Sequence, residues 1–321
     1  LMGKAGFARI QDRSGRVQIY INKKNIGDDA FAVWKKLDVG DHIHVRGRFM
    51  RTRTGEATIL AGTLALAGKC IASMPDKHKG ITDIEFKSRQ RYVDLFMDPA
   101  SAETFRRRSE IVRYTREFFN ARDYLEVETP MMHVIPGGAA ARPFVTHHNA
   151  LDMELYMRVA PELYLKRLVV GGFDRVFEIN RNFRNEGVST KHNPEFTMLE
   201  FYEAYQTWDG LMVLTEDLVS GMAKHVTGEH AVEYGDITLN FAKPWRRLKM
   251  ADAIAEYAEL SAEAVTDVAA LKARWLQDHP KDAKDPNLPS TVGKWYEWFM
   301  DGYVEEHLVQ PTFITHFPVE I

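Results

Sequence analysis

The side chains with the most evident chemical capacity lie in the stretch 175–202, in two strand-like runs joined by a polar loop. In both runs apolar and polar residues alternate, which is the two-residue period of a strand with one buried face. The apolar parity consists of Phe177, Ile179, Leu199 and Phe201. The other parity carries carboxylates, amides, an arginine and aromatic rings: Glu178, Asn180, Asn182, Arg184, Phe196, Met198, Glu200 and Tyr202. An outward-facing sheet surface more often carries Lys, Thr or Ser, so this pattern indicates the floor of a binding site.

The chemistry that these residues suit is nucleotide binding. Arg184 has the planar fork that binds a phosphate or a carboxylate through paired hydrogen bonds. Phe196 can stack on a base, a contact worth about 1–3 kcal/mol. In the loop, Glu186 can accept a hydrogen bond from an exocyclic amine, and His192 can contact a polyphosphate. The alternative is a polar hairpin on a purely structural sheet, and the pattern alone leaves it open.

The sequence segments FRNE (183–186) and HNPEF (192–196) resemble motif 2 of the class II aminoacyl-tRNA synthetases, in the variant found in the bacterial lysyl-tRNA synthetases. The resemblance implies that Arg184 is catalytic at the α-phosphate of ATP and that Phe196 lies beneath the adenine. The ATP-binding residues that it implies are Arg184, Glu186, His192, Asn193 and Phe196. The implied activity is the ATP-dependent ligation of L-lysine to its tRNA through a lysyl-adenylate, in translation.

A second group of residues favours a cationic amino acid as the substrate. Glu162 opens a helix after Pro161, and by itself it is explained as a partner of the helix dipole, worth about 0.3–1 kcal/mol. Together with Glu200 and Tyr202 it forms an anionic site, whereas a pocket for aspartate should carry a basic residue. A site that hydrogen-bonds a terminal amine also rejects neutral analogues strongly.

The small, backbone-rich segment 136–144 extends the resemblance to the lysyl enzymes. Glycine in such a segment lets the main chain approach a ligand closely. The resemblance implies that the backbone of Gly138 lies beside the amino group of the substrate. The implied lysine-binding residues are Gly138, Glu162, Glu200 and Tyr202.

Composition describes an ordinary globular protein of 321 residues, with 45% hydrophobic and 27% charged residues. The length suggests about two domains. No apolar run approaches the roughly 18 residues of a membrane helix, so we expect no membrane partner. One cysteine, Cys70, excludes an internal disulfide framework and fits a cytoplasmic location.

Residues 1–74 are expected to form a small β-domain. Residues 1–80 hold 15 Lys+Arg against 7 Asp+Glu, a net of +8, which indicates a polyanionic partner. Four strand-like runs with one interposed helix match the order of an OB-fold. The segment GRVQIY resembles the anticodon-binding domain of the lysine, aspartate and asparagine synthetases. By that resemblance Phe7 stacks on an anticodon base, while Gln18 and Glu56 read base edges.

The remaining chain divides into a linker, 75–98, and a class II catalytic domain, 99–321, giving an α+β protein whose catalytic sheet is mainly antiparallel and flanked by helices. The long helix 102–120 and the strand 124–129, which ends at Pro130, resemble motif 1, the element that builds the homodimer interface of the family. The 3′ end of the tRNA is expected at this domain.

Both ends of the sequence are expected to be truncated, since the first barrel strand is incomplete and the family's motif 3 has no counterpart within 1–321. Mg²⁺ is expected to act with ATP, with its ligands outside this stretch and none within it. Two alternatives stay open. One is an aspartyl- or asparaginyl-tRNA synthetase. The other is a catalytically inactive paralogue that binds RNA.

Overall fold

The computed structural model describes residues 3–72, 74, 81–189 and 192–321. The chain forms two compact units, with the boundary between Glu103 and Thr104. Each unit has its own hydrophobic core.

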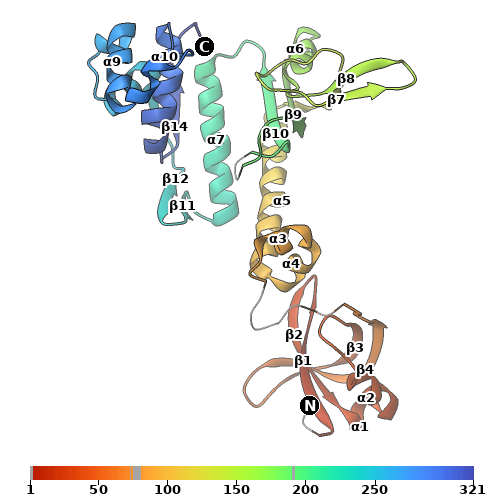
Figure 1. Cartoon of the computed structure of the whole chain (residues 1–321). Helices are drawn as coiled ribbons and strands as arrows, with labels where there is room; N and C mark the ends of the chain where they lie inside the picture. Colours follow the sequence, from red (N-terminus) through yellow and green to blue (C-terminus); the bar gives the residue numbers. More distant parts are fainter. Residues whose placement is uncertain (1–2, 73, 75–80, 190–191) are drawn as a thin grey trace. The chain divides into compact units, whose positions relative to one another are not determined.

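The first unit is built on a four-stranded sheet in the order β1-β2-β4-β3 (Figure 1). The strands are β1 (Ala5–Asp12), β2 (Gly15–Asn22), β3 (His42–Arg51) and β4 (Ala57–Gly68). Neighbours pair antiparallel except β2 and β4, which run parallel. The helices α1 (Lys23–Ile26) and α2 (Asp28–Trp34) follow β2, and Phe31 of α2 is buried with Ile19 and Ile21. The four strands and the interposed helical segment that the sequence predicts are confirmed.

The segment expected to be a linker is more regular than its sequence suggests. Two helices, α3 (Ile84–Arg89) and α4 (Arg91–Met97), occupy it. Asp83 caps α3 by accepting hydrogen bonds from the backbone N–H groups of Glu85 at 2.9 Å and Phe86 at 3.3 Å. The sequence of these residues lacks apolar periodicity, but the cap at Asp83 and the hydrogen bond from Arg91 Nη1 to the buried Asp94 carboxylate at 2.7 Å stabilise the helices. Residues 75–80 of the expected linker lie outside the described residues.

The second unit contains the predicted hairpin, formed by β9 (Arg175–Phe183) and β10 (Glu195–Glu203), with the short strand β5 (Leu125–Glu126) parallel to β9 at the edge. The long helices α5 (Pro99–Asn120) and α7 (Trp208–Thr227) supply the cover for one face. Phe119 of α5 stacks on Phe177 with ring centroids 4.9 Å apart, and Leu199 and Phe201 join the same core. The apolar parity of the hairpin therefore faces this hydrophobic core, as predicted.

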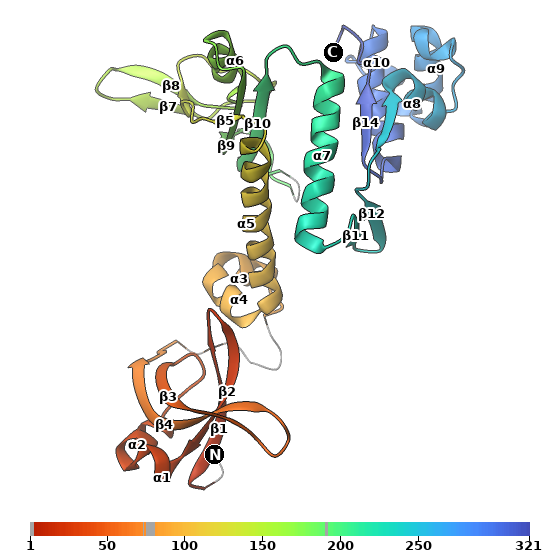
Figure 2. The ribbon, with the colours of Figure 1, turned by 180° about the vertical axis from the view of Figure 1, so that it is seen from behind.

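Smaller elements complete this unit. A second sheet has the order β6-β8-β7, made of β6 (Met132–His133), β8 (Met153–Met157) and β7 (Val145–His148). Helix α6 (Glu162–Val170) follows β8. Both views place the β7–β8 ribbon on the side of the hairpin away from α7 (Figures 1 and 2).

The C-terminal part of the unit packs around the buried side chains of Trp295, Phe299 and Leu271. Its strands are β11 (Ala231–Tyr234), β12 (Ile237–Asn240), β13 (Arg246–Lys249) and β14 (Thr312–Thr315). Its helices are α8 (Met250–Tyr257), α9 (Val268–Asp278) and α10 (Val292–Phe299), with short 3-10 or π turns at Ala264–Thr266, Pro280–Lys284, Met300–Val304 and Glu305–His307. The buried carboxylate of Glu216 on α7 joins this part to the helix by accepting a hydrogen bond from the Trp245 backbone N–H at 3.1 Å.

Candidate active site

The polar face of the β9–β10 hairpin is the candidate site. The register places Glu178 opposite Glu200, Asn180 opposite Met198 and Asn182 opposite Phe196. Glu178 and Asn182 are each only 1% exposed, so this face is covered by other parts of the unit and is not an outward-facing sheet surface. Because alternate residues of a strand are about 6.6 Å apart, the face presents its polar groups in regularly spaced rows.

On this face lies a buried ion pair between Arg158 and Glu178, each about 1% exposed. Arg158 Nη1 donates to Glu178 Oε1 at 2.7 Å, and Arg158 Nε donates to the carbonyl oxygen of Arg181 at 2.8 Å. Thr129 closes the network, because its hydroxyl donates to Glu178 Oε2 at 2.7 Å and accepts from Arg158 Nη1 at 3.0 Å. Asn180 Nδ2 donates to the same carboxylate at 3.1 Å. The network fixes the chain that follows β5 and the end of β8 against the hairpin.

At the loop end of the hairpin, Arg184 and Phe196 are neighbours. The guanidinium carbon lies 5.3 Å from the centroid of the Phe196 ring. Arg184 Nε is buried and has no hydrogen-bond partner among the described residues. The backbone is fixed on both sides: Arg184 N–H donates to the Pro194 carbonyl at 2.9 Å, and Asn185 N–H to the Arg142 carbonyl at 2.7 Å. A donor held without a partner beside an aromatic ring suits a ligand that carries both an anionic group and a base.

The other predicted nucleotide contacts, Glu186, His192 and Asn193, are exposed on the connecting loop. His192 Nδ1 lies 2.9 Å from the hydroxyl oxygen of Ser189, and the His192 backbone N–H donates to that oxygen at 3.1 Å. Residues 190–191, between them, lie outside the described part. None of the contacts of the described residues joins these three side chains to Arg184 or Phe196.

The opposite end of the face is acidic. Tyr202 donates a hydrogen bond from its hydroxyl to Glu200 Oε1 at 2.8 Å. Burial raises the pKa of the Glu200 carboxyl above its ordinary value, the Tyr202 hydrogen bond opposes this rise, and the nearby carboxylate of Glu162 adds to it. Burial also raises the pKa of the Tyr202 hydroxyl, and its hydrogen bond to Glu200 raises it further.

Gly138 lies against Glu162. Its φ of +91° is in the region that favours glycine, and a Cβ there would lie 3.1 Å from Glu162 Cβ and 3.2 Å from Ala160 Cβ. Glu162 is the first residue of α6, directly after Pro161. The structure therefore brings together the four residues Gly138, Glu162, Glu200 and Tyr202 from a loop, a helix and a strand. Phe196 and Glu200 are four positions apart on β10, a distance of about 13 Å.

Two features of the site were not predicted. Arg158 and Thr129 form a network with Glu178 on the polar face of the hairpin, and Lys166 pairs with Glu162. A signal for Arg158 does exist in the sequence, because a lone arginine between apolar residues is rarely buried unless it is paired.

In the first unit, the predicted nucleic-acid contacts lie on one sheet face. Phe7 pairs with Tyr20 across β1 and β2, with ring centroids 4.8 Å apart, and is 49% exposed. Gln18 Nε2 donates to the hydroxyl of Thr58 at 2.9 Å, and Glu56 lies 3.7 Å from the guanidinium of Arg9. An exposed aromatic ring that packs on a half-buried one, beside amide and charged groups, is an arrangement that suits the binding of unstacked bases.

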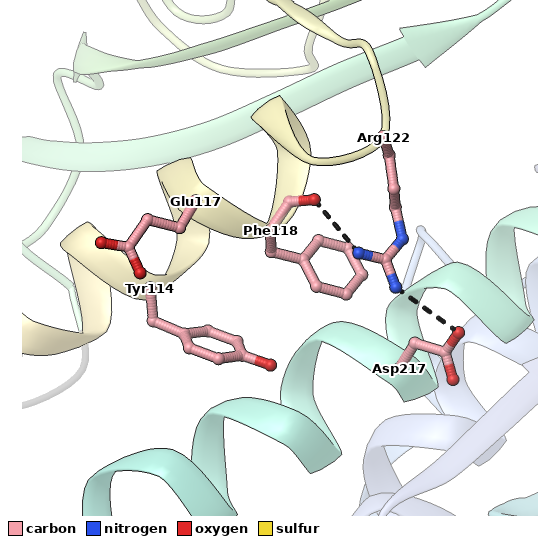
Figure 3. Close-up of a pocket in the computed structure, with 5 residues that line it drawn as sticks. All are labelled: Tyr114, Glu117, Phe118, Arg122 and Asp217. Carbon is pink, nitrogen blue, oxygen red and sulfur yellow. Dashed lines mark hydrogen bonds and ion pairs between the residues drawn. The ribbon is translucent and has the colours of Figure 1, made fainter.

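A separate cavity of about 450 Å³ lies between α5 and α7 (Figure 3). Arg122 stacks on Phe118 with its guanidinium carbon 3.5 Å from the ring centroid, and it lies 4.0 Å from Asp217. Asp217 also contacts Lys243, and Glu117 contacts Arg113 at 4.0 Å. Because its charged groups are paired with one another, this cavity indicates no particular ligand.

The described residues contain no group of three or more His, Cys, Asp or Glu side chains that could bind a metal ion. Glu178, the most buried carboxylate of the hairpin, is engaged by Arg158 and Thr129. The donors present therefore do not fit a resident magnesium site. In the same part of the chain no helix is long and apolar enough to cross a membrane.

Comparisons with known proteins agree with both units. Residues 83–321 match the family of class II tRNA synthetases (D, K and N), and residues 1–66 match the OB-fold nucleic acid binding domain. The chain belongs to the class II tRNA synthetases of this group, with an OB-fold domain preceding the synthetase domain.

Among its relatives are three proteins named lysine–tRNA ligase. Those of Xylella fastidiosa, Bacillus cereus and Pelotomaculum thermopropionicum are 51%, 49% and 48% identical to it, over 99–100% of the chain. The chain spans about 63% of the length of each of these relatives.

Removing one partner of the buried pair should destabilise the second unit strongly. In Arg158→Met, Glu178 keeps a buried charge without its main partner, so we expect a loss of about 3–5 kcal/mol in the free energy of unfolding. The double variant Arg158→Met with Glu178→Leu should lose less than Arg158→Met alone. Urea unfolding followed by tryptophan fluorescence measures both. Lys294→Met, which removes an exposed pair with Glu297, is the control and should cost under about 1 kcal/mol. Equal losses for Arg158→Met and the control would contradict the assignment.

Stability should also depend on pH through Glu200. The pKa of the Glu200 carboxyl is higher in the folded chain than its ordinary value of 4.5. Its contribution to the free energy of unfolding is therefore fully present below pH 4.5, and it is lost as the pH rises through the raised pKa. Glu200→Gln should therefore gain stability relative to the unmodified chain across that window, with a constant difference at higher pH. Unfolding free energies measured at intervals from pH 4 upward test this. The exposed Glu229, changed to Gln, is the control for removing a surface carboxylate.

Proposed function

We propose that this chain carries the amino-acid activation site and the tRNA anticodon-binding domain of an enzyme that ligates L-lysine to its tRNA at the expense of ATP. The observation that carries the proposal is the pairing of two chemically different ends on one hairpin face. Arg184 and Phe196 lie at one end, and Glu162, Glu200 and Tyr202 lie at the other. The names of the relatives support the choice of lysine.

In the first step the carboxylate of lysine attacks the α-phosphorus of ATP. The bond to the β-phosphate oxygen breaks, and lysyl-adenylate and pyrophosphate form. Arg184 is the proposed catalytic residue, because its guanidinium can neutralise charge that develops on the α-phosphate. Phe196 stacks beneath the adenine, and Glu186, His192 and Asn193 frame the rest of the ATP. No protein nucleophile takes part, so rate enhancement comes from positioning and charge.

In the second step a ribose hydroxyl at the 3′ end of the tRNA attacks the lysyl carbonyl, and AMP leaves. The lysine is bound by Gly138, Glu162, Glu200 and Tyr202. The carboxyl groups of Glu162 and Glu200 make this end acidic, which favours a cation and opposes an acidic amino acid. Mg²⁺ is expected to accompany ATP, because free polyphosphate needs charge compensation. The residues described here supply no site for it.

The domain assignment completes the proposal. Residues 1–74 bind the anticodon through Phe7, Gln18 and Glu56, residues 75–98 connect the domains, and residues 99–321 belong to the catalytic domain. The motif 1 elements, α5 and β5, are the proposed homodimer surface, and the proposed location is the cytoplasm.

Amino-acid-dependent exchange of pyrophosphate into ATP tests the activity across all twenty amino acids. It should be measured on this chain and on a chimera in which residues 1–321 replace the matching part of the Xylella fastidiosa relative. We expect exchange by the chimera with lysine alone. Exchange with aspartate or asparagine would overturn the choice of substrate. A chimera that melts cooperatively and binds RNA, yet exchanges with no amino acid while the unmodified relative does, would favour an RNA-binding paralogue.

The anticodon assignment predicts that Phe7→Ala weakens binding of a lysine-tRNA anticodon stem-loop by about 1–3 kcal/mol, the worth of one base stacked on an aromatic ring. Phe49 is a matched control, because it is 74% exposed and belongs to the same domain without contacting Tyr20 in the described ring pairs. Fluorescence anisotropy at fixed salt gives both affinities. Equal losses for Phe7→Ala and Phe49→Ala would contradict the assignment.

A further inference from the structure

Lys166 lies one helical turn after Glu162 on α6, and it contacts the acidic end of the hairpin face. Its Nζ lies 2.5 Å from Glu162 Oε1 and 5.8 Å from the centroid of the Tyr202 ring. The ammonium group therefore contacts one carboxylate of the proposed lysine site and faces a ring of the same site. None of the roles described above uses this residue.

The two oxygens of Glu162 face different neighbours. Oε1 accepts from Lys166, whereas Oε2 is the oxygen nearer Gly138, 3.7 Å from the position that a Cβ would take there. A carboxylate can accept about four hydrogen bonds, so engagement of Oε1 leaves Oε2 able to accept from a ligand. Lys166 thus contacts the Glu162 oxygen that is farther from Gly138, whose backbone is proposed to border the substrate amino group.

Electrostatic repulsion by Glu200 favours orientations of the Glu162 side chain that point away from the pocket. The pKa of Glu200 is raised in part by the negative charge of Glu162, which means that the two carboxylates repel each other. A cation on Oε1 offsets this repulsion and restricts the side chain to one orientation. The side chain of Lys166 is itself 54% exposed, so it does not fill the pocket as a substitute for the substrate.

We propose that Lys166 is a positioning residue for the amino-acid substrate, which holds the Glu162 carboxylate so that Oε2 faces Gly138 and is free to bind the substrate ammonium. This inference rests on the proposed function, because it takes lysine as the ligand of the site. It adds a residue that contacts no reacting atom and acts only through Glu162.

Binding of lysine and of ATP to this chain, measured by calorimetric titration, tests the proposal. Lys166→Gln should raise the Kd for lysine about threefold to tenfold, the range for losing one oriented charge contact, and leave the Kd for ATP unchanged. Lys166→Arg, which keeps the charge, should restore most of the affinity. Lys294→Gln removes a comparable lysine–glutamate pair on α10, far from the site in sequence, and should change neither constant.

A double-mutant cycle separates positioning from a general effect on the fold. If Lys166 acts through Glu162, then Lys166→Gln should have no further effect in a Glu162→Gln background. Additive effects, an unchanged Kd for lysine in Lys166→Gln, or a lower Kd would each overturn the inference, the last by showing that Lys166 competes with the substrate. Failure of the proposed function is distinguishable, because the unmodified chain would then bind no lysine.

Discussion

The ion pair between Arg158 and Glu178 is the interaction on which the candidate site depends. Two full charges are about 1% exposed, so each needs the other and the hydroxyl of Thr129 to offset the loss of hydration. These residues come from the segment after β5, the end of β8 and the middle of β9. A single buried network therefore sets the relative positions of the segments that surround the hairpin. The positions of the other polar side chains on the same face depend on this network.

The hairpin itself divides its two faces between stability and chemistry. One face contributes Phe177, Leu199 and Phe201 to a core shared with α5 and α7. The other face carries groups that are costly to bury, such as Asn182 and the Arg184 Nε, each with an atom that lacks a partner among the described residues. Such unsatisfied groups are retained where a ligand can engage them. The hydrophobic core on the apolar face thus stabilises a hairpin whose polar face contains atoms without hydrogen-bond partners among the described residues.

The hairpin and its core-facing parity could be predicted from the sequence, because Phe177, Ile179, Leu199 and Phe201 share one parity and a strand with a two-residue period places such residues on one face. The grouping of Glu162 with Glu200 and Tyr202 was also predicted from the sequence. Two carboxylates and a tyrosine hydroxyl, at the start of a helix and on one face of a strand, are groups that can bind the same cationic ligand. The Arg158 network was not predicted, because its three members are 20 to 49 positions apart in the chain. Helices α3 and α4 were missed because capping by Asp83 and a buried Asp94 stabilise them without apolar periodicity.

The central claim is that the acidic end of the hairpin selects a cationic amino acid. Calorimetric titration of this chain with lysine and, separately, with aspartate tests it most directly, in the unmodified form and in the double variant Glu162→Gln, Glu200→Gln. The account predicts that lysine binds, that aspartate does not, and that the double variant loses lysine binding. Binding of aspartate, or lysine binding that survives both substitutions, would contradict it.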